Sequence, residues 1–236
     1  MEKAYKLLAL QENISNNQAK ELIDRGLVYQ AGKRVTVART EYPLTIRFTV
    51  KYPQKIKKIY ENKELIAVNK PIGITSDEVE KEFIGTSLIH RLDRDTSGVL
   101  LLAKSEEVKN RAIEEFKKKR VYKEYVAIVE GLVVEPIVID TPIQTQKGTQ
   151  AISKTAKIGK EAKTIVEPYG IEENKTSRIK VVIETGATHQ IRVHLKSAGY
   201  PIIGDVKYGG KPSNRLYLHA KKIKIFDYEI EAAEEF

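Results

Sequence analysis

Two aspartates and two arginines alternate between residues 91 and 95. A Thr-Ser-Gly turn follows at 96–98, and the apolar run 99–103 predicts a strand buried on both faces. This places carboxylates where the core meets solvent, which is a common position for a reactive group. A structural ion-pair network has the same spacing. The charges alone therefore leave both interpretations open.

Several other chemistries are disfavoured. The chain has no cysteine, and no glycine-rich loop precedes a Lys-Ser or Lys-Thr pair. His189 and His194 are five residues apart, unlike the i, i+4 pair of a helical zinc site. Ser97 lacks the G-x-S-x-G context of a nucleophilic serine. The remaining candidate chemistry is that of a carboxylate, with Asp93 or Asp95 as nucleophile or base and an arginine to orient it. We expect no metal site.

The elements around this stretch predict an α+β fold. Residues 64–70, 121–131 and 179–183 read as strands, and Ser105 begins an amphipathic helix. Polar, strand-like segments between 134 and 177 favour long hairpins over helical crossovers. We therefore predict a largely antiparallel mixed sheet with flanking helices.

A second helix follows Thr188, which we expect to be its N-cap, and ends at Gly199. Arg192 lies in the first turn of this helix, where the helix dipole disfavours a cation. We therefore expect Arg192 to have a carboxylate partner.

The composition restricts the partners. The chain has 236 residues and a net charge of +9 with a pI near 9.4, which favours a polyanionic partner such as nucleic acid. There is no apolar run long enough to span a bilayer and no secretory signal. We expect a cytoplasmic, monomeric protein that has no membrane contact.

Residues 1–50 predict a small separate unit. Ser15 and Gln18 form a capping-box pattern, and a hairpin turns around Ala31-Gly32. This order resembles the S-four RNA-binding module. The resemblance implies RNA contacts, and a merely solvated basic face is the alternative. The basic residues concerned are Lys20, Arg25, Lys33 and Arg34. We predict a linker at 51–59 and a catalytic domain at 60–236.

Five stretches in order are similar to one enzyme family. Residues 90–98 resemble the H-R-L-D-x-x-T-S-G signature of RluA-type pseudouridine synthases. Residues 68–73, 123–127, 189–194 and 218–220 resemble further motifs of that family, and so does Gly204-Asp205. The resemblance spans about residues 60 to 226.

It implies isomerisation of uridine to pseudouridine in RNA, without cofactor or metal. By position, Asp93 is the catalytic aspartate and Arg192 is its partner. Tyr125 packs on the uracil ring and is a candidate base for the proton on carbon 5. Whether Asp93 attacks the base or the ribose, or removes a sugar proton, stays open.

The resemblance also implies RNA contacts. Arg91 matches a residue that fills the gap left by the flipped base. Four other residues of these motifs are expected to contact substrate or RNA: His90, His189, Gln190 and Lys70. Asp95 is expected to cap the turn at 96–98. Ala187 stands where the family usually has arginine.

Two questions stay open. The N-terminal unit favours large-subunit ribosomal RNA as the target, with transfer RNA as the alternative. The competing functions are a non-catalytic RNA-binding or ribosome-assembly factor, and a glycoside hydrolase that uses Asp93 and Asp95.

Overall fold

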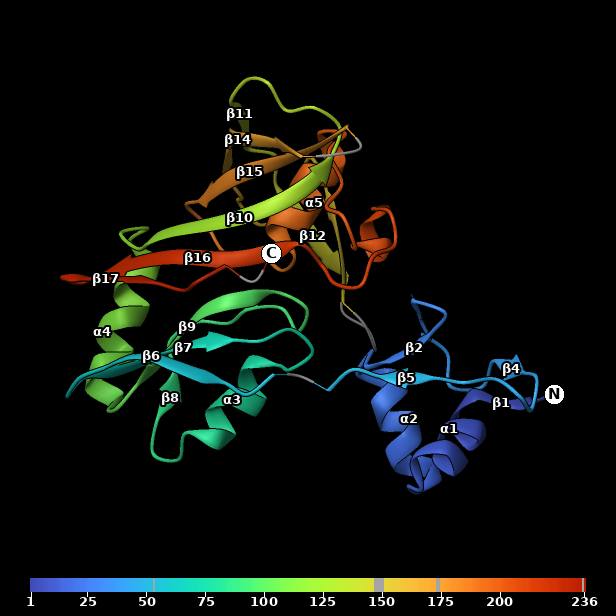
Figure 1. Cartoon of the computed structure of the whole chain (residues 1–236). Helices are drawn as coiled ribbons and strands as arrows, with labels where there is room; N and C mark the ends of the chain where they lie inside the picture. The colour runs from blue at the N-terminus through green and yellow to red at the C-terminus, as the bar shows by residue number, and fades with distance from the viewer. Residues whose placement is uncertain (53, 147–150, 173–174, 235) are drawn as a thin grey trace.

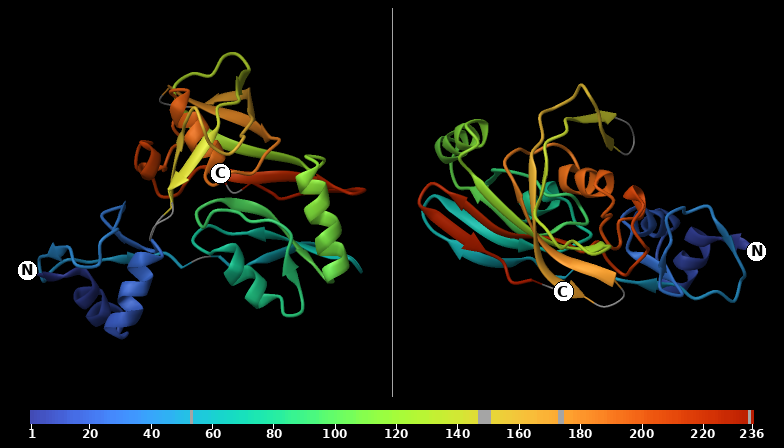
Figure 2. Two further views of the ribbon diagram at one scale, coloured as in Figure 1. Left: turned by 180° about the vertical axis from the view of Figure 1, so that it is seen from behind. Right: turned by 90° about the horizontal axis from the view of Figure 1, so that it is seen from above.

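A computed structural model describes residues 1–52, 54–146, 151–172, 175–234 and 236. A large twisted sheet dominates the molecule, and the N-terminal unit, residues 1–50, lies to one side of it (Figures 1 and 2). Among the described residues, no helix combines the length and apolarity that a membrane span requires.

The large sheet has ten strands and is mixed but mostly antiparallel, as predicted. Its main path runs in the order β11-β14-β15-β10-β16-β9-β7-β6, while β8 pairs with β9 and β17 pairs with β16. The strands are β6 (Lys57–Glu61), β7 (Leu65–Lys70), β8 (Ser87–Leu88), β9 (Ser97–Ala103), β10 (Tyr122–Glu130), β11 (Ile137–Ile139), β14 (Thr164–Glu172), β15 (Thr176–Ile183), β16 (Leu218–Ile225) and β17 (Tyr228–Glu231). The linker predicted at 51–59 therefore overlaps β6.

The two halves of the sheet meet where β9 runs parallel to β16. Gly98 lies opposite Ala220, with a φ of +116°, and an added Cβ would lie 2.2 Å from the Ala220 carbonyl oxygen. Only glycine fits such a close approach with this backbone angle. Beside it, the Ser97 hydroxyl contacts Nδ1 of buried His219 at 2.9 Å. The Thr-Ser-Gly turn thus joins the two halves of the sheet.

Alternate residues of β7 and β9 pack into different cores, because successive side chains of a strand point to opposite faces. One core contains Ile66 and Leu100 and packs against α3 (Ser76–Glu82) and α5 (Gln190–Ser197). The other contains Leu65 and Leu101 and packs against α4 (Glu106–Lys117).

Side-chain caps begin α3 and α4, whereas α5 has none. Ser105 caps α4, as predicted, and accepts a hydrogen bond from the backbone of Val108. The expected cap of α5 at Thr188 is wrong, because the N-cap is His189 in a left-handed conformation with φ of 55°. Arg192 does lie in the first turn of this helix.

A small two-stranded sheet lies beside α5. It pairs β12 (Ile143–Gln146) with β13 (Ile152–Thr155), and a 3-10 helix, η2 (Val206–Tyr208), packs nearby. Buried Ile143, Ala162, Val193 and Tyr208 form their common core.

The N-terminal unit has its own core, which includes Leu8, Ile23, Val28 and Phe48. The predicted capping box of Ser15 and Gln18 is present. The elements are β1 (Glu2–Lys3), α1 (Ala4–Glu12), α2 (Asn16–Asp24), β2 (Val28–Gln30), β3 (Lys33–Arg34), β4 (Glu41–Tyr42) and β5 (Thr49–Val50).

Ion pairs connect this unit to the large sheet. Arg34 contacts Asp95 at 3.3 Å, and Arg25 contacts Glu78 at 3.1 Å. Asp95 was expected to cap the turn at 96–98. That expectation is wrong, because its two carboxylate oxygens face Arg34.

Candidate active site

A cavity of about 1000 Å³ opens beside the loop that precedes β9. Its wall also includes β10, the loop after β15 and the start of α5. Seven of the residues singled out in the sequence line it: His90, Arg91, Asp93, Tyr125, His189, Gln190 and Arg192.

Asp93 lies in a loop that backbone hydrogen bonds fix from behind. The Thr96 amide donates to the Asp93 carbonyl oxygen at 3.1 Å, and the Gly73 amide donates to the Arg94 carbonyl oxygen at 3.0 Å. The Asp93 side chain is 28% exposed and faces the cavity. Its Oδ2 accepts a hydrogen bond from Arg192 at 3.1 Å. Within the described part of the chain, nothing bonds to Oδ1.

Lys70 braces the same loop from inside the protein, which corrects its expected role as an RNA contact. The residue is fully buried, and Nζ donates to the carbonyl oxygens of Pro71, Ile74 and Arg94 at 2.9 to 3.1 Å. Burial lowers the pKa of Lys70 to about 7, even though Asp95 and Asp93 favour its charged form. An RNA strand in the cavity cannot reach this amino group.

Arg192 is shared between two carboxylates. Its Nε and one terminal nitrogen donate to Asp205, each at 2.7 Å, and the other terminal nitrogen donates to Asp93. Burial opposes the charge, but Asp205 and Asp93 outweigh it and raise the pKa of Arg192. The predicted ion pair with Asp93 is present. The two-point contact, however, is with Asp205.

Asp205 was not among the predicted site residues. It is 2% exposed, and tightly packed glycines flank it. A Cβ on Gly204 would lie 1.7 Å from the Arg215 carbonyl oxygen, and one on Gly210 would lie 1.9 Å from that of Ile202. The sequence signal was the Gly204-Asp205 pair, together with the need of Arg192 for an acid. Asp93 alone already met that need.

His189 lines this end of the cavity and contacts Tyr208. His189 Nε2 lies 3.9 Å from Asp93 Oδ2, and Nδ1 lies 2.7 Å from the Tyr208 hydroxyl. The Tyr208 hydroxyl also accepts a hydrogen bond from the Ser153 amide at 3.0 Å. Burial lowers the pKa of His189, and with the positive charge of Arg192 it outweighs the opposing effect of Asp93. The imidazole beside Asp93 is therefore neutral at neutral pH.

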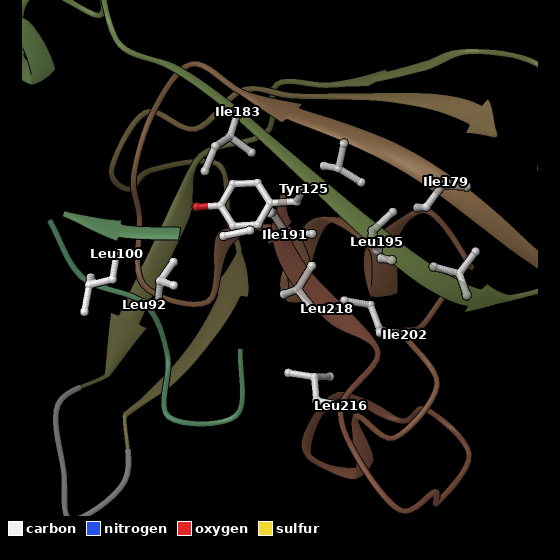
Figure 3. Close-up of a cluster of buried hydrophobic side chains, with 14 of the residues drawn as sticks. Leu92, Leu100, Tyr125, Ile179, Ile183, Ile191, Leu195, Ile202, Leu216 and Leu218 are labelled. Atoms are coloured by element: carbon white, nitrogen blue, oxygen red, sulfur yellow. The ribbon is translucent and has the colours of Figure 1, made fainter. Parts of the chain in front are cut away.

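Tyr125 projects from β10 into the apolar side of the cavity. Its ring lies in the cluster that contains Leu92, Ile183 and Ile191 (Figure 3). Burial and the nearby charge of Asp93 raise the pKa of the phenol. Tyr125 is therefore protonated at neutral pH and presents a ring and a hydroxyl to the cavity.

His90 and Gln190 line the cavity, and each also forms hydrogen bonds within the protein. His90 Nε2 accepts from the Leu101 amide at 3.2 Å, and burial lowers the pKa of His90 to about 3. The Gln190 amide donates to the Lys163 carbonyl oxygen, and its oxygen accepts from the Ala187 amide. Gln190 is 3% exposed. These bonds support the surrounding loops, and the RNA contacts expected of His90 and Gln190 stay predictions.

Arg91 lies at the rim of the cavity. Its guanidinium binds both oxygens of Asp77, at 3.0 and 2.9 Å, and its side chain is 67% exposed. It is therefore accessible to a large ligand.

The four basic residues of the N-terminal unit do not line the cavity. Arg25 and Arg34 form the ion pairs to the large sheet. Lys20 lies over the ring of Tyr5 at 4.6 Å, and Lys33 is exposed.

The described residues contain no group of three histidine or acidic side chains arranged to hold a metal ion. The polar groups at this end of the cavity are a carboxylate, a guanidinium, a neutral imidazole and a phenol. These groups suit acid–base or nucleophilic chemistry by Asp93.

Comparisons with known proteins agree with this reading. The sequence model of the RNA pseudouridylate synthase family matches residues 78–197. A protein of Helicobacter pylori strain J99, described as an uncharacterized RNA pseudouridine synthase, is 50% identical over 98% of this chain and 97% of its own length. The tRNA pseudouridine synthase C of Pasteurella multocida is 36% identical over 73% of this chain and 86% of its own.

A solved structure is also similar. Human RNA pseudouridylate synthase domain containing 1 matches with a TM-score of 0.66 and 26% identity, over 77% of this chain and 84% of that one. Together with the geometry around Asp93 and Arg192, these similarities show that the chain belongs to the RNA pseudouridylate synthase family.

Proposed function

We propose that this enzyme isomerises specific uridines in structured RNA to pseudouridine and that Asp93 is its reactive carboxylate. The observation that carries the proposal is the geometry of that carboxylate. Oδ2 is held by Arg192, which Asp205 fixes in turn. Oδ1 has no partner among the described residues, and the Asp93 side chain lines the cavity.

The reaction rearranges bonds within one nucleotide. The bond from nitrogen 1 of uracil to carbon 1′ of the ribose breaks, the base rotates, and carbon 5 bonds to carbon 1′. The proton on carbon 5 leaves, and nitrogen 1 gains one. Attack on the base, attack on the ribose and removal of a sugar proton all need an ionised carboxylate with an open oxygen. Asp93 offers such an oxygen at Oδ1, which has no partner among the described residues.

Arg192 orients Asp93 through one hydrogen bond to a single carboxylate oxygen. Because Asp205 takes the two-point contact, Asp93 receives a single hydrogen bond of 3.1 Å. The single hydrogen bond from Arg192 fixes the direction of the Asp93 carboxylate and leaves its second oxygen available to the substrate.

Tyr125 has two proposed parts in the reaction. Its ring offers an apolar surface for the uracil, as expected for an enzyme that must take a base out of its stack. Its hydroxyl is protonated in the free enzyme, because burial raises its pKa. To act as the base at carbon 5, Tyr125 must first pass this proton to another group.

Arg91 is suited to support the flipped state. Taking a base out of its stack costs a few kcal/mol, so a group that replaces lost stacking lowers the cost. A guanidinium is planar and stacks on bases. Because the Arg91–Asp77 pair is exposed, exchanging it for RNA costs little.

The N-terminal unit is proposed to bind RNA outside the cavity. Lys20 and Lys33 are the residues of the predicted basic face that form no ion pair among the described residues. Arg25 and Arg34 hold the unit against the large sheet.

Two classes of RNA are candidate substrates of this enzyme. Relatives carry names for two classes: tRNA pseudouridine synthase C at 36% identity, and ribosomal large subunit pseudouridine synthase D of Buchnera aphidicola at 30%. We therefore propose both classes for testing. Pseudouridines would be mapped in ribosomal and transfer RNA from cells with the gene, without it, and with it restored. A site that disappears and returns supports the proposal, and identical maps contradict it.

A further inference from the structure

Seven basic side chains line the cavity, and they differ in their partners. Four pair with a carboxylate: Arg91, Lys117, Lys119 and Arg192. Arg94 donates to the Asp24 carbonyl oxygen at 3.5 Å. Like Arg94, Lys123 and Lys160 have no carboxylate of the described residues within ion-pair distance, but these two lysines bond to the same loop.

Lys123 projects from β10 on the same face as Tyr125. It is 8% exposed, and Nζ donates to the Thr185 carbonyl oxygen at 2.8 Å. Burial, and then the positive charge of Lys160, lower the pKa of Lys123 to about 8. Its ammonium group is thus mostly protonated at neutral pH and is close enough to Lys160 to be repelled by it.

Lys160, which is exposed, bonds to the same loop. Its Nζ donates to the Gly186 carbonyl oxygen at 2.8 Å, so the two lysines bond to consecutive carbonyls. Its backbone is fixed by two hydrogen bonds with Ile143, at 2.8 and 2.9 Å. An ammonium group has three donors, and one carbonyl uses only one of them. Each lysine therefore keeps donors for a ligand.

Two ammonium groups that share a loop and lack acids repel each other, and an anion between them removes that cost. The cavity is large enough for such an anion in addition to a base. Its volume of about 1000 Å³ is at the upper end of the range, roughly 300 to 1000 Å³, that holds a drug-sized ligand. An RNA strand carries a phosphodiester on each side of the target uridine.

We propose that Lys123 and Lys160 form a phosphate subsite for the nucleotide next to the target uridine. The inference rests on the proposed function, because it assumes that RNA occupies this cavity. Lysine is a common point-charge partner for phosphate. The role of the two lysines is to hold the RNA strand beside the flipped base, while Asp93 performs the chemistry.

The test removes the charge from each side of the contact. The probe is a synthetic RNA stem–loop containing the uridine found by mapping, with a neutral methylphosphonate replacing one phosphodiester at a time. The wild type should bind one of the two flanking replacements about tenfold more weakly than unmodified RNA, the size expected for one charged hydrogen bond. Lys160→Ala should bind the same two RNAs equally.

Two variants separate the contact from folding effects. Lys157→Ala removes an exposed lysine of the same segment that does not line the cavity, and it should behave as wild type. Lys160→Arg keeps the charge and should restore the preference for the charged linkage. Equal losses by Lys160→Ala on all RNAs, or no loss on any, would overturn the subsite.

The contact of Lys123 is tested by the salt dependence of RNA binding. Removing this side chain also leaves the Thr185 carbonyl oxygen without its hydrogen-bond donor. Binding of bulk ribosomal RNA and of bulk transfer RNA would be measured over a range of salt. Relative to wild type, Lys123→Met should reduce the slope of log affinity against log salt by about 0.7 to 0.9, the value for one phosphate contact. An unchanged slope counts against Lys123.

Failure of this inference and failure of the proposed function look different. A wild type that forms pseudouridine but binds both methylphosphonate RNAs as tightly as unmodified RNA contradicts only the subsite. A wild type that forms no pseudouridine in any RNA contradicts the proposed function.

Discussion

At the scale of single residues, the site depends on how one guanidinium divides its hydrogen bonds. Arg192 gives two to Asp205 and one to Asp93. The position of Arg192 in the first turn of a helix showed that it needs an acid. The sequence could not show that it has two, because Asp205 reaches it only through a glycine-dependent loop.

The first prediction concerns Asp205 as a positioning residue. Asp205→Asn keeps the shape of the side chain but loses one acceptor, so the guanidinium can turn toward Asp93. We expect turnover to fall on the order of a hundredfold, the size of effect that a small misplacement produces. RNA affinity should stay close to that of wild type.

The measurement is single-turnover conversion together with RNA binding. Asp227→Asn, which changes an exposed acid, is the matched control. An equal loss of affinity and turnover would mean that Asp205 supports the fold rather than the direction of Asp93.

At the scale of elements, the sheet depends on the junction of β9 and β16. The strand at 99–103 and the helix begun by Ser105 were predictable from apolar spacing and capping. The parallel pairing across the junction was not, because it joins residues more than a hundred positions apart. Local patterns carry no information about such a partner.

The second prediction tests the close approach at this junction. In Gly98→Ala, the new methyl group would meet the backbone of Ala220 at a positive φ. Overpacking and backbone strain together should cost about 2 to 6 kcal/mol of unfolding free energy. Urea unfolding measures the cost. In Gly170→Ala the methyl group would lie 4.0 Å from Arg178, so this control should change stability by only about 0.5 kcal/mol. Equal losses in the two variants would contradict the account.

The third prediction concerns His219, which is fully buried beside Ser97. Burial lowers the pKa of His219 to about 4, below the usual 6.5. Folding therefore favours the neutral ring, and its contribution is complete above pH 6.5 and is lost as the pH falls toward 4. Between pH 7 and pH 5 this histidine should account for a loss of about 2 kcal/mol in unfolding free energy.

Urea unfolding of the wild type and of His219→Asn at both pH values isolates this contribution. The amide can still bond to Ser97, but it does not titrate. If both proteins lose the same stability between pH 7 and pH 5, His219 is not the cause.

At the scale of the whole molecule, the basic residues have two roles. Some lie around the cavity, and others form ion pairs within the fold. Composition predicted a polyanionic partner, and cations do gather around the cavity. Composition could not show that Arg25 and Arg34 bond to acids of the large sheet. Charge counts do not reveal which cations are already paired within the fold.

The fourth prediction follows from this charge. If the enzyme contacts six to ten phosphates, its affinity for RNA should fall by about 10³ to 10⁵ between 50 and 200 mM salt. Filter binding or fluorescence anisotropy over this range tests it. An affinity independent of salt would mean that phosphate contacts do not dominate binding.

The central claim is that the reactive carboxylate is Asp93 and not its neighbour Asp95. The most direct measurement is the pseudouridine content, by mass spectrometry, of RNA from gene-deleted cells after incubation with each purified protein. Asp93→Asn keeps an acceptor for Arg192 and should convert no uridine. Asp95→Asn keeps an acceptor for Arg34 and should convert as wild type does. Full conversion by Asp93→Asn would contradict the account.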